Sequence, residues 1–273
     1  MSEALVKLIK PKLHFSHGNG FPSPCYRQIL TALAPYFECV YIDKVGHAPE
    51  YPILDNWEAL TDEVIASIRR QSDGPVIAVG HSLGGVLNIF AALKQPELFQ
   101  AVILLDSPLL SRMRQRGLHL SKKLGFIDKI TPARRTQGRR CHWPSRDAAF
   151  KYLKRRELFK HVTEACLNDY IDYGMTQDAS GYTLRFDSEV EYQIYRTMPH
   201  SLAAYPKNLH VPSALIYGSD SDVIHAADRR HMKQRYGISS FKIEGTHMFP
   251  FEHPKATALL ILKVMSYLQK TKE

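Results

Sequence analysis

The segment Gly80-His81-Ser82-Leu83-Gly84-Gly85 constrains this chain more than any other. It follows an apolar run at 75–79, typical of a buried strand, and precedes an apolar run at 86–93, typical of a helix. A Gly-x-Ser-x-Gly pattern at such a junction predicts a tight turn that strains the backbone at its serine. The alternative, a glycine-rich turn that only joins two elements, leaves this context unexplained. We therefore predict that the Ser82 hydroxyl is presented at the top of a sheet, where the strand ends, above a helix N-terminus that favours developing negative charge.

Strand and helix patterns alternate around this turn. This alternation predicts an α/β fold with a mostly parallel sheet that is flanked by helices on both faces. The predicted strands lie near residues 12–16, 38–42, 75–80, 101–106, 212–217 and 239–244, and the predicted helices near 24–34, 56–71, 83–94, 226–236 and 254–269.

A serine nucleophile needs a base, and the base needs an acid that orients it. Asp220 and Asp222 follow the predicted strand at 212–217, and His247 follows the one at 239–244. Parallel sheets place their chemistry at the carboxyl ends of their strands. The order Ser, Asp, His along the chain therefore predicts a catalytic triad, and spacing alone leaves Asp220 and Asp222 as rival acids.

The developing oxyanion also needs backbone donors. One donor is predicted to be the N–H of Leu83, which follows the nucleophile, and the other the N–H of Asn19, in the loop after the strand at 12–16. Glycines on both sides of Asn19 let its backbone approach a substrate oxygen closely. We assign His17 a structural role.

Four blocks resemble the α/β-hydrolase superfamily, in its serine hydrolase or esterase-like form with a helical cap. They are His17-Gly18-Asn19-Gly20, the turn around Ser82, Gly218-x-x-Ser221-Asp222-Val223-Ile224, and Gly245-Thr246-His247 followed by Glu252-His253-Pro254. The resemblance implies that Ser82 is the nucleophile and His247 the base. It favours Asp222 over Asp220, because the family's common form is Gly, two variable residues, Ser, Asp and two aliphatic residues. Only 16 residues precede His17, so we expect the N-terminal strands of the family to be reduced, with 5–9 as a candidate strand.

The middle of the chain loses the strand pattern and gains helical spacing with scattered aromatic residues. We therefore predict a core formed by residues 1–109 and 206–273, and a helical cap formed by 110–205, where relatives insert a lid. We expect Phe21, Trp143, Phe150 and Met248 to line the substrate pocket, with the cap's own small core as the alternative for Trp143 and Phe150.

The cap also carries the positive charge of the chain. Residues 111–160 hold 16 Lys and Arg but only three acids, whereas the whole chain holds 36 and 27, so the remainder is slightly acidic. The charge is interpreted as a solvated surface, as recognition of an anionic substrate, or as contact with an anionic membrane surface. We expect no nucleic-acid partner, because no recognised nucleic-acid fold surrounds the basic residues.

Several classes of site and segment lack support in the sequence. No metal-ligand spacing occurs, and we expect neither a metal nor a cofactor. No apolar run approaches the roughly 20 residues of a membrane span, and the opening residues do not resemble a signal peptide. The four cysteines show no Cys-x-x-Cys spacing and are interpreted as reduced thiols, so we expect a cytoplasmic protein.

The resulting prediction is a serine hydrolase that cleaves a small carboxylic ester through an acyl-enzyme intermediate. A thioesterase or a C–C bond hydrolase acting on an anionic substrate is the alternative within the enzyme class. A hydrolase-like receptor or binding module is the alternative outside it. Neither the oligomeric state nor the physiological substrate follows from the sequence.

Overall fold

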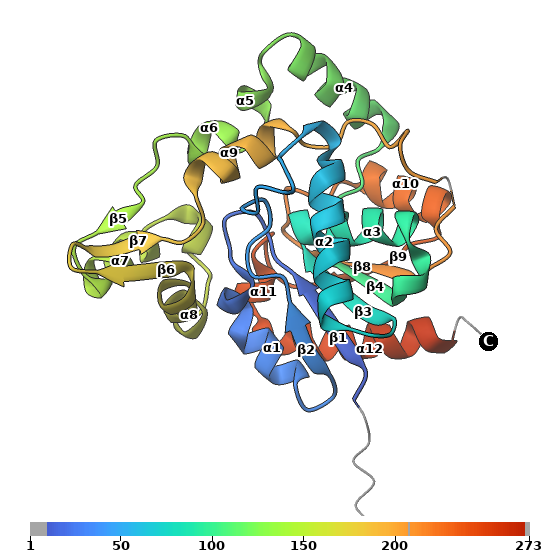
Figure 1. Ribbon diagram of the computed structural model, residues 1–273, viewed down its shortest axis with the longest axis horizontal. Coiled ribbons are helices and arrows are strands. Elements are labelled where there is room, and N and C mark those ends of the chain that lie inside the picture. The colour runs from blue at the N-terminus through green and yellow to red at the C-terminus, as the bar shows by residue number, and fades with distance from the viewer. Residues whose placement is uncertain (1–9, 207, 271–273) are drawn as a thin grey trace, which may run out of the picture.

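A six-stranded parallel sheet forms the centre of the molecule (Figure 1). The computed structural model describes residues 10–206 and 208–270. The strand order is β2-β1-β3-β4-β8-β9, so β3, which leads into the Ser82 turn, lies inside the sheet between β1 and β4. The strands are β1 (Lys12–Ser16), β2 (Glu38–Tyr41), β3 (Val76–His81), β4 (Phe99–Leu105), β8 (Ser213–Gly218) and β9 (Ser239–Ile243).

Helices cover both faces of this sheet, and each face has its own apolar cluster. Alternate residues of a strand point to opposite faces, so Ile77 and Val79 join one cluster and Val76 and Ala78 the other. The first cluster includes α1 (Arg27–Leu33) and α12 (Pro254–Lys270), and the second includes α2 (Glu58–Gln71), α3 (Leu83–Lys94) and α10 (Ala226–Tyr236). Short helices η1 (Ser23–Tyr26), η2 (Asp55–Trp57), η3 (Pro96–Leu98) and α11 (Phe249–Glu252) complete the core.

The six predicted strands and five predicted helices of the core are confirmed, with boundaries that differ by a few residues at most. The mostly parallel sheet with flanking helices is also confirmed. The candidate strand at 5–9 lies outside the described residues.

The segment 110–205, which we call the cap, is mostly helical but also contains a small sheet. Its helices are α4 (Arg112–Lys123), α5 (Ile127–Ile130), α6 (Ala133–Thr136), α7 (Arg146–Lys154), η4 (Glu157–Phe159), α8 (Glu164–Gly174) and α9 (Ser188–Arg196). The antiparallel strands β5 (His142–Trp143), β6 (Met175–Asp178) and β7 (Gly181–Leu184) pair in the order β5-β7-β6. The expectation that strands vanish from this segment was therefore wrong.

The cap packs directly against the core. The Phe21 ring of the core lies 4.9 Å from that of Tyr170 on α8 and 5.9 Å from that of Phe159 in η4. These contacts belong to the same apolar cluster as α1 and α12, so the two parts share buried surface. Within the described residues, no helix is long and apolar enough to cross a membrane.

Candidate active site

Ser82 sits in the strained turn that the sequence predicts. Its φ of 51° and ψ of −115° are unusual for a residue with a side chain, and it is the residue immediately before α3. A Cβ at Gly84 would lie 2.1 Å from the Ser16 carbonyl oxygen, and one at Gly80 would lie 2.5 Å from the Gly84 carbonyl carbon. Only glycine fits at either position, because the turn folds tightly against β1 and against itself.

Two backbone hydrogen bonds hold this turn against neighbouring loops. The N–H of Ser82 donates to the Leu105 carbonyl at 2.9 Å, and the N–H of Gly84 donates to the His17 carbonyl at 3.0 Å. The ends of β1, β3 and β4 are thereby tied together around the serine. In the part of the chain that the structure describes, the Ser82 hydroxyl itself makes no hydrogen bond.

His247 is held by a carboxylate, and that carboxylate is Asp106. Its Nδ1 lies 2.7 Å from Oδ2 of Asp106, which immediately follows β4 and has no exposed surface. A carboxylate can only accept, so Nδ1 carries the proton when the ring is neutral. The other ring nitrogen, Nε2, is then unprotonated and is the atom that can act as a base.

The prediction that Asp222 orients His247 was wrong, and so was the rival prediction for Asp220. Both aspartates are exposed, and Asp220 accepts a hydrogen bond from the neighbouring Ser219 hydroxyl at 3.0 Å. In this loop it is Ser221 that points inward, and its hydroxyl donates to Asp106 Oδ2 at 2.5 Å. The loop motif that contains Asp222 therefore supplies a hydrogen bond to the acid, through Ser221, and not the acid itself.

Asp106 is stabilised as an anion despite complete burial. Burial alone would raise its pKa, but hydrogen bonds from His247, from the Ser221 hydroxyl and from the Gly218 N–H at 2.9 Å lower it below the ordinary value. Hydrogen bonds to the charged form of a carboxylate favour that form. The site thus maintains a buried negative charge directly behind the imidazole of His247.

His81 connects the loop of Asn19 to the loop of His247. Its Nε2 lies 3.0 Å from the His247 carbonyl oxygen and must donate there, so its Nδ1 accepts from the Tyr26 hydroxyl at 2.7 Å. The Tyr26 oxygen in turn accepts from the Gly18 N–H at 3.0 Å. Burial lowers the pKa of His81 to about 3, which agrees with a neutral ring that both donates and accepts.

Glu252 fixes the loop that carries His247. Its carboxylate accepts from the Thr246 N–H at 2.8 Å and from the Thr246 hydroxyl at 2.5 Å, and its side chain is buried. The Glu252-His253-Pro254 block of the sequence therefore has a structural role beside the histidine.

The two predicted oxyanion donors lie in loops that meet at the turn. The structure brings the Asn19 loop beside the start of α3 through the bond between Gly84 and His17. Among the described residues, neither the Asn19 nor the Leu83 backbone N–H donates a hydrogen bond. The His17 ring accepts from the Val45 N–H at 2.8 Å, in keeping with the structural role expected for it.

The four predicted pocket residues all belong to, or pack against, the apolar cluster that the cap shares with the core. Phe21 and Met248 are buried, and they follow Asn19 by two residues and His247 by one. Trp143 lies on β5, at the outer end of the cap in Figure 1, where its ring is 5.5 Å from that of Tyr152. Phe150 on α7 is half-buried beneath the Lys154 ammonium. Trp143 is fully buried in the cluster that includes residues of both the cap and the core.

One ion pair of the cap, between the half-buried Arg139 and the buried Glu191, lies over the Asn19 loop. Arg139 pairs with Glu191 on α9, whose backbone carbonyl accepts from the Asn19 amide at 3.0 Å. Glu191 also packs so closely on Gly20 that a Cβ there would lie 2.8 Å from its carboxylate. Burial raises the pKa of Glu191 and Arg139 opposes that effect. The Nε atom of Arg139 is buried and has no hydrogen-bond partner among the described residues.

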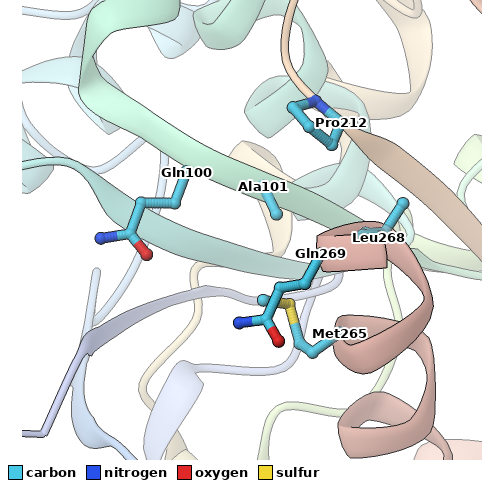
Figure 2. Close-up of a pocket in the computed structure, with 6 residues that line it drawn as sticks. All are labelled: Gln100, Ala101, Pro212, Met265, Leu268 and Gln269. Atoms are coloured by element: carbon cyan, nitrogen blue, oxygen red, sulfur yellow. The ribbon is translucent and has the colours of Figure 1, made fainter. Parts of the chain in front are cut away.

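A cavity on the opposite edge of the sheet is unrelated to this arrangement. Figure 2 shows it between α12 and the amino-terminal ends of β4 and β8, lined by Gln100, Ala101, Pro212, Met265, Leu268 and Gln269. Its lining contains apolar side chains and amides but no titratable group. The described residues also contain no cluster of three His, Cys, Asp or Glu side chains that could hold a metal ion.

Comparisons with known proteins agree with this architecture. A sequence profile described as the Alpha/beta hydrolase family matches residues 15–258. A 98-residue stretch is 31% identical to 2-(acetamidomethylene)succinate hydrolase of Mesorhizobium japonicum, so the match spans 35% of this chain and about a third (35%) of that protein.

Two solved structures illustrate the shared fold. The crystal structure of E-2-(acetamidomethylene)succinate hydrolase has a TM-score of 0.77 and 21% identity, over 94% of this chain and 92% of that one. The thioesterase domain from the Curacin biosynthetic pathway has a TM-score of 0.70 and 18% identity, over 93% and 91%.

Proposed function

Because this chain belongs to the alpha/beta hydrolase family, we propose that it is a serine hydrolase that cleaves a small carboxylic ester. The observation that carries this proposal is the hydrogen bond between His247 and the buried Asp106, formed at the same sheet edge as the strained Ser82. A nucleophile, a base and an orienting acid on three neighbouring loops are what acyl transfer requires.

In the first half of the proposed reaction, Ser82 attacks the ester carbonyl carbon while Nε2 of His247 accepts its hydroxyl proton. The carbonyl oxygen becomes an oxyanion, which the N–H groups of Leu83 and Asn19 stabilise by hydrogen bonds. The protonated imidazole then gives its proton to the departing alcohol oxygen as the C–O bond breaks. The acyl group remains on Ser82 Oγ.

In the second half, His247 accepts a proton from water as the water oxygen attacks the acyl-enzyme carbonyl. Collapse of this intermediate releases the carboxylic acid and returns the proton to Ser82 Oγ. Asp106 keeps the proton of the neutral imidazole on Nδ1 and stabilises the imidazolium in both halves. Ser221 and the Gly218 N–H act as positioning groups for Asp106.

The direct test is labelling with a fluorophosphonate combined with turnover of p-nitrophenyl esters of graded chain length. We expect the wild-type protein to label and to turn over many times, and Ser82→Ala to lose both while remaining folded. Triad members act as a unit, so the loss in kcat is expected to be several orders of magnitude. Labelling followed by a single burst of product would favour a receptor over an enzyme and overturn the proposal.

A second candidate is hydrolysis of a thioester or a C–C bond in an anionic substrate. Two observations support it: the half-buried Arg139, paired with Glu191 above the Asn19 loop, and the local identity to a hydrolase whose name specifies a succinate, which is a dicarboxylate. Parallel assays with an ester, a thioester and a β-diketone, each in a neutral and a carboxylate-bearing form, distinguish the candidates. A higher kcat/KM for a carboxylate-bearing thioester or diketone than for every ester would replace ester hydrolysis with this second function.

A further inference from the structure

The outer face of α4 carries apolar side chains that nothing in the described chain covers. Met113, Leu120 and Leu124 are 78%, 52% and 61% exposed. Their spacings of seven and four residues put them on one side of the helix and its C-terminal end, as a stripe. Figure 1 shows α4 at the periphery of the molecule, with α5 beside it. Of the eleven large hydrophobic side chains that are exposed among the described residues, four lie within residues 113–130, so they are concentrated here.

The inner face of α4 packs against the rest of the protein. Leu118 packs with Leu110 and Ile127, and the helix start is anchored to the buried Asp228 of α10 through the Ser111 N–H and the Arg114 guanidinium. These contacts fix the orientation of α4 on the core. The exposed stripe is therefore not needed to hold the helix in place.

Basic side chains run along one side of the stripe. Arg112, Arg116 and Lys123 are all exposed, and Lys129 follows on α5. None of the four forms an ion pair with a described residue, whereas Arg114 and Lys122, on the other side, pair with Asp228 and Asp55. At helical spacing, Arg112, Arg116 and Lys123 form a row beside the apolar stripe.

We propose that this surface, the stripe together with its basic row, docks on an anionic lipid membrane. A helix with an apolar stripe and a cationic border lies in the plane of a bilayer interface, with its leucines among the acyl chains and its cations at the headgroups. Clusters of Lys and Arg add attraction to anionic headgroups. A second copy of this chain is the less favoured occupant, because an antiparallel stripe-to-stripe contact would place the two cationic rows on the same side. The inference concerns a surface outside the proposed active site and does not rest on the proposed activity.

The test is sedimentation of the full-length protein with phosphatidylcholine vesicles, with and without about a third of phosphatidylserine. We expect binding only to the anionic vesicles, with loss at about 0.5 M salt, since screening shortens the reach of surface charges. The double variant Leu120→Ser/Leu124→Ser and the triple variant Arg112→Gln/Arg116→Gln/Lys123→Gln should each weaken binding about tenfold or more.

A matched control is available on α12, where the 59% exposed Leu259 lies one helical turn from both Lys255 and Lys263. Leu259→Ser should bind vesicles as the wild type does, and all variants should hydrolyse a water-soluble ester equally. Equal binding to neutral and anionic vesicles, or unchanged binding of the stripe variant, overturns the proposal. A wild-type dimer that the stripe variant converts to a monomer, with vesicle binding unchanged, would assign the stripe to a second copy instead.

Discussion

The Asp106–His81 network at the carboxyl ends of the strands and the Arg139 pair of the cap differ in how fully their polar groups are hydrogen-bonded. At the sheet edge, buried Asp106 accepts three hydrogen bonds, and the Tyr26 hydroxyl and both ring nitrogens of His81 are paired. In the cap, Arg139 keeps a buried Nε without a hydrogen-bond partner in the described chain, and most basic side chains face solvent. A network in which every polar group is hydrogen-bonded rigidifies a site, whereas an unpaired donor remains available to bind a ligand. We therefore propose that the sheet end carries out the chemistry and that Arg139 of the cap takes part in substrate selection.

The largest expected effect comes from removing the acid. Asp106→Asn should lower kcat for ester hydrolysis roughly 10³- to 10⁴-fold, because an amide no longer favours the Nδ1–H tautomer of His247. Asp222→Asn is the matched control and should keep near-wild-type kcat, since that side chain is exposed. Steady-state kinetics with melting temperatures measure both. A heavy loss in Asp222→Asn with little loss in Asp106→Asn would refute the assignment.

A smaller effect is expected from the network that joins the two loops. Tyr26→Phe removes a hydroxyl that serves both the Gly18 N–H and His81 Nδ1. Leaving a buried polar group unpaired costs about 1–3 kcal/mol, so we expect a lower melting temperature and a kcat reduced about tenfold. Tyr36→Phe, on a side chain that is 54% exposed, should change neither quantity. If the two variants behaved alike, the network would have no positioning role.

A smaller effect, a few-fold change in the preference for a charged over a neutral substrate, is expected from the cap. Of the neighbouring arginines 134, 135, 139 and 140, only Arg139 is turned inward. We therefore expect Arg139→Gln to reduce kcat/KM several-fold for a carboxylate-bearing ester, and much less for a neutral ester of equal length. The triple variant Arg134→Gln/Arg135→Gln/Arg140→Gln should leave the ratio between the two substrates unchanged. If the ratio of kcat/KM between the charged and the neutral ester changed in the triple variant but not in Arg139→Gln, the exposed arginines, and not Arg139, would select the substrate.

The core should also show a graded dependence of stability on pH. Burial lowers the pKa of His14 to about 3, of His17 to about 4 and of His81 to about 3, from an ordinary 6.5. Below pH 6.5 the unfolded chain binds protons that the folded chain excludes, so stability is complete above 6.5 and falls as pH decreases toward 3–4. The slope is about 1.4 kcal/mol per pH unit for each histidine.

Urea denaturation between pH 7 and about pH 5 measures this slope. His14→Gln should make the dependence shallower, and His161→Gln, on an exposed side chain, should not. A free energy of unfolding that stayed constant over this range would contradict neutral burial of the three histidines.

Much of the core was predictable because its elements are long and apolar. The strand that ends at His81 and the helix that begins at Leu83 follow from periodicity, and the glycines around Ser82 follow from the turn. The small sheet of the cap was missed because its strands have two to four residues, too few for a period-2 pattern among aromatic side chains that also fit helical spacing.

The acid was missed for a different reason. Asp222 was preferred on the form of a loop motif, but in that loop the side chain of Ser221 points inward and that of Asp222 outward. The available signal was Asp106 itself, a carboxylate that directly follows the apolar run 101–105. Its proximity to Ser82 depends on β4 being the neighbour of β3, which is a property of the strand order and not of local sequence.

The most direct test of the account is the tautomer of His247, read from ¹⁵N chemical shifts of histidine-labelled protein, with His247→Gln used to assign the signals. At a pH where the ring is neutral, we predict that His247 carries its proton on Nδ1 in the wild type and in Asp222→Asn. We predict that Asp106→Asn loses this preference. An Nδ1–H tautomer that survived in Asp106→Asn and disappeared in Asp222→Asn would contradict the central claim that Asp106 orients the catalytic base.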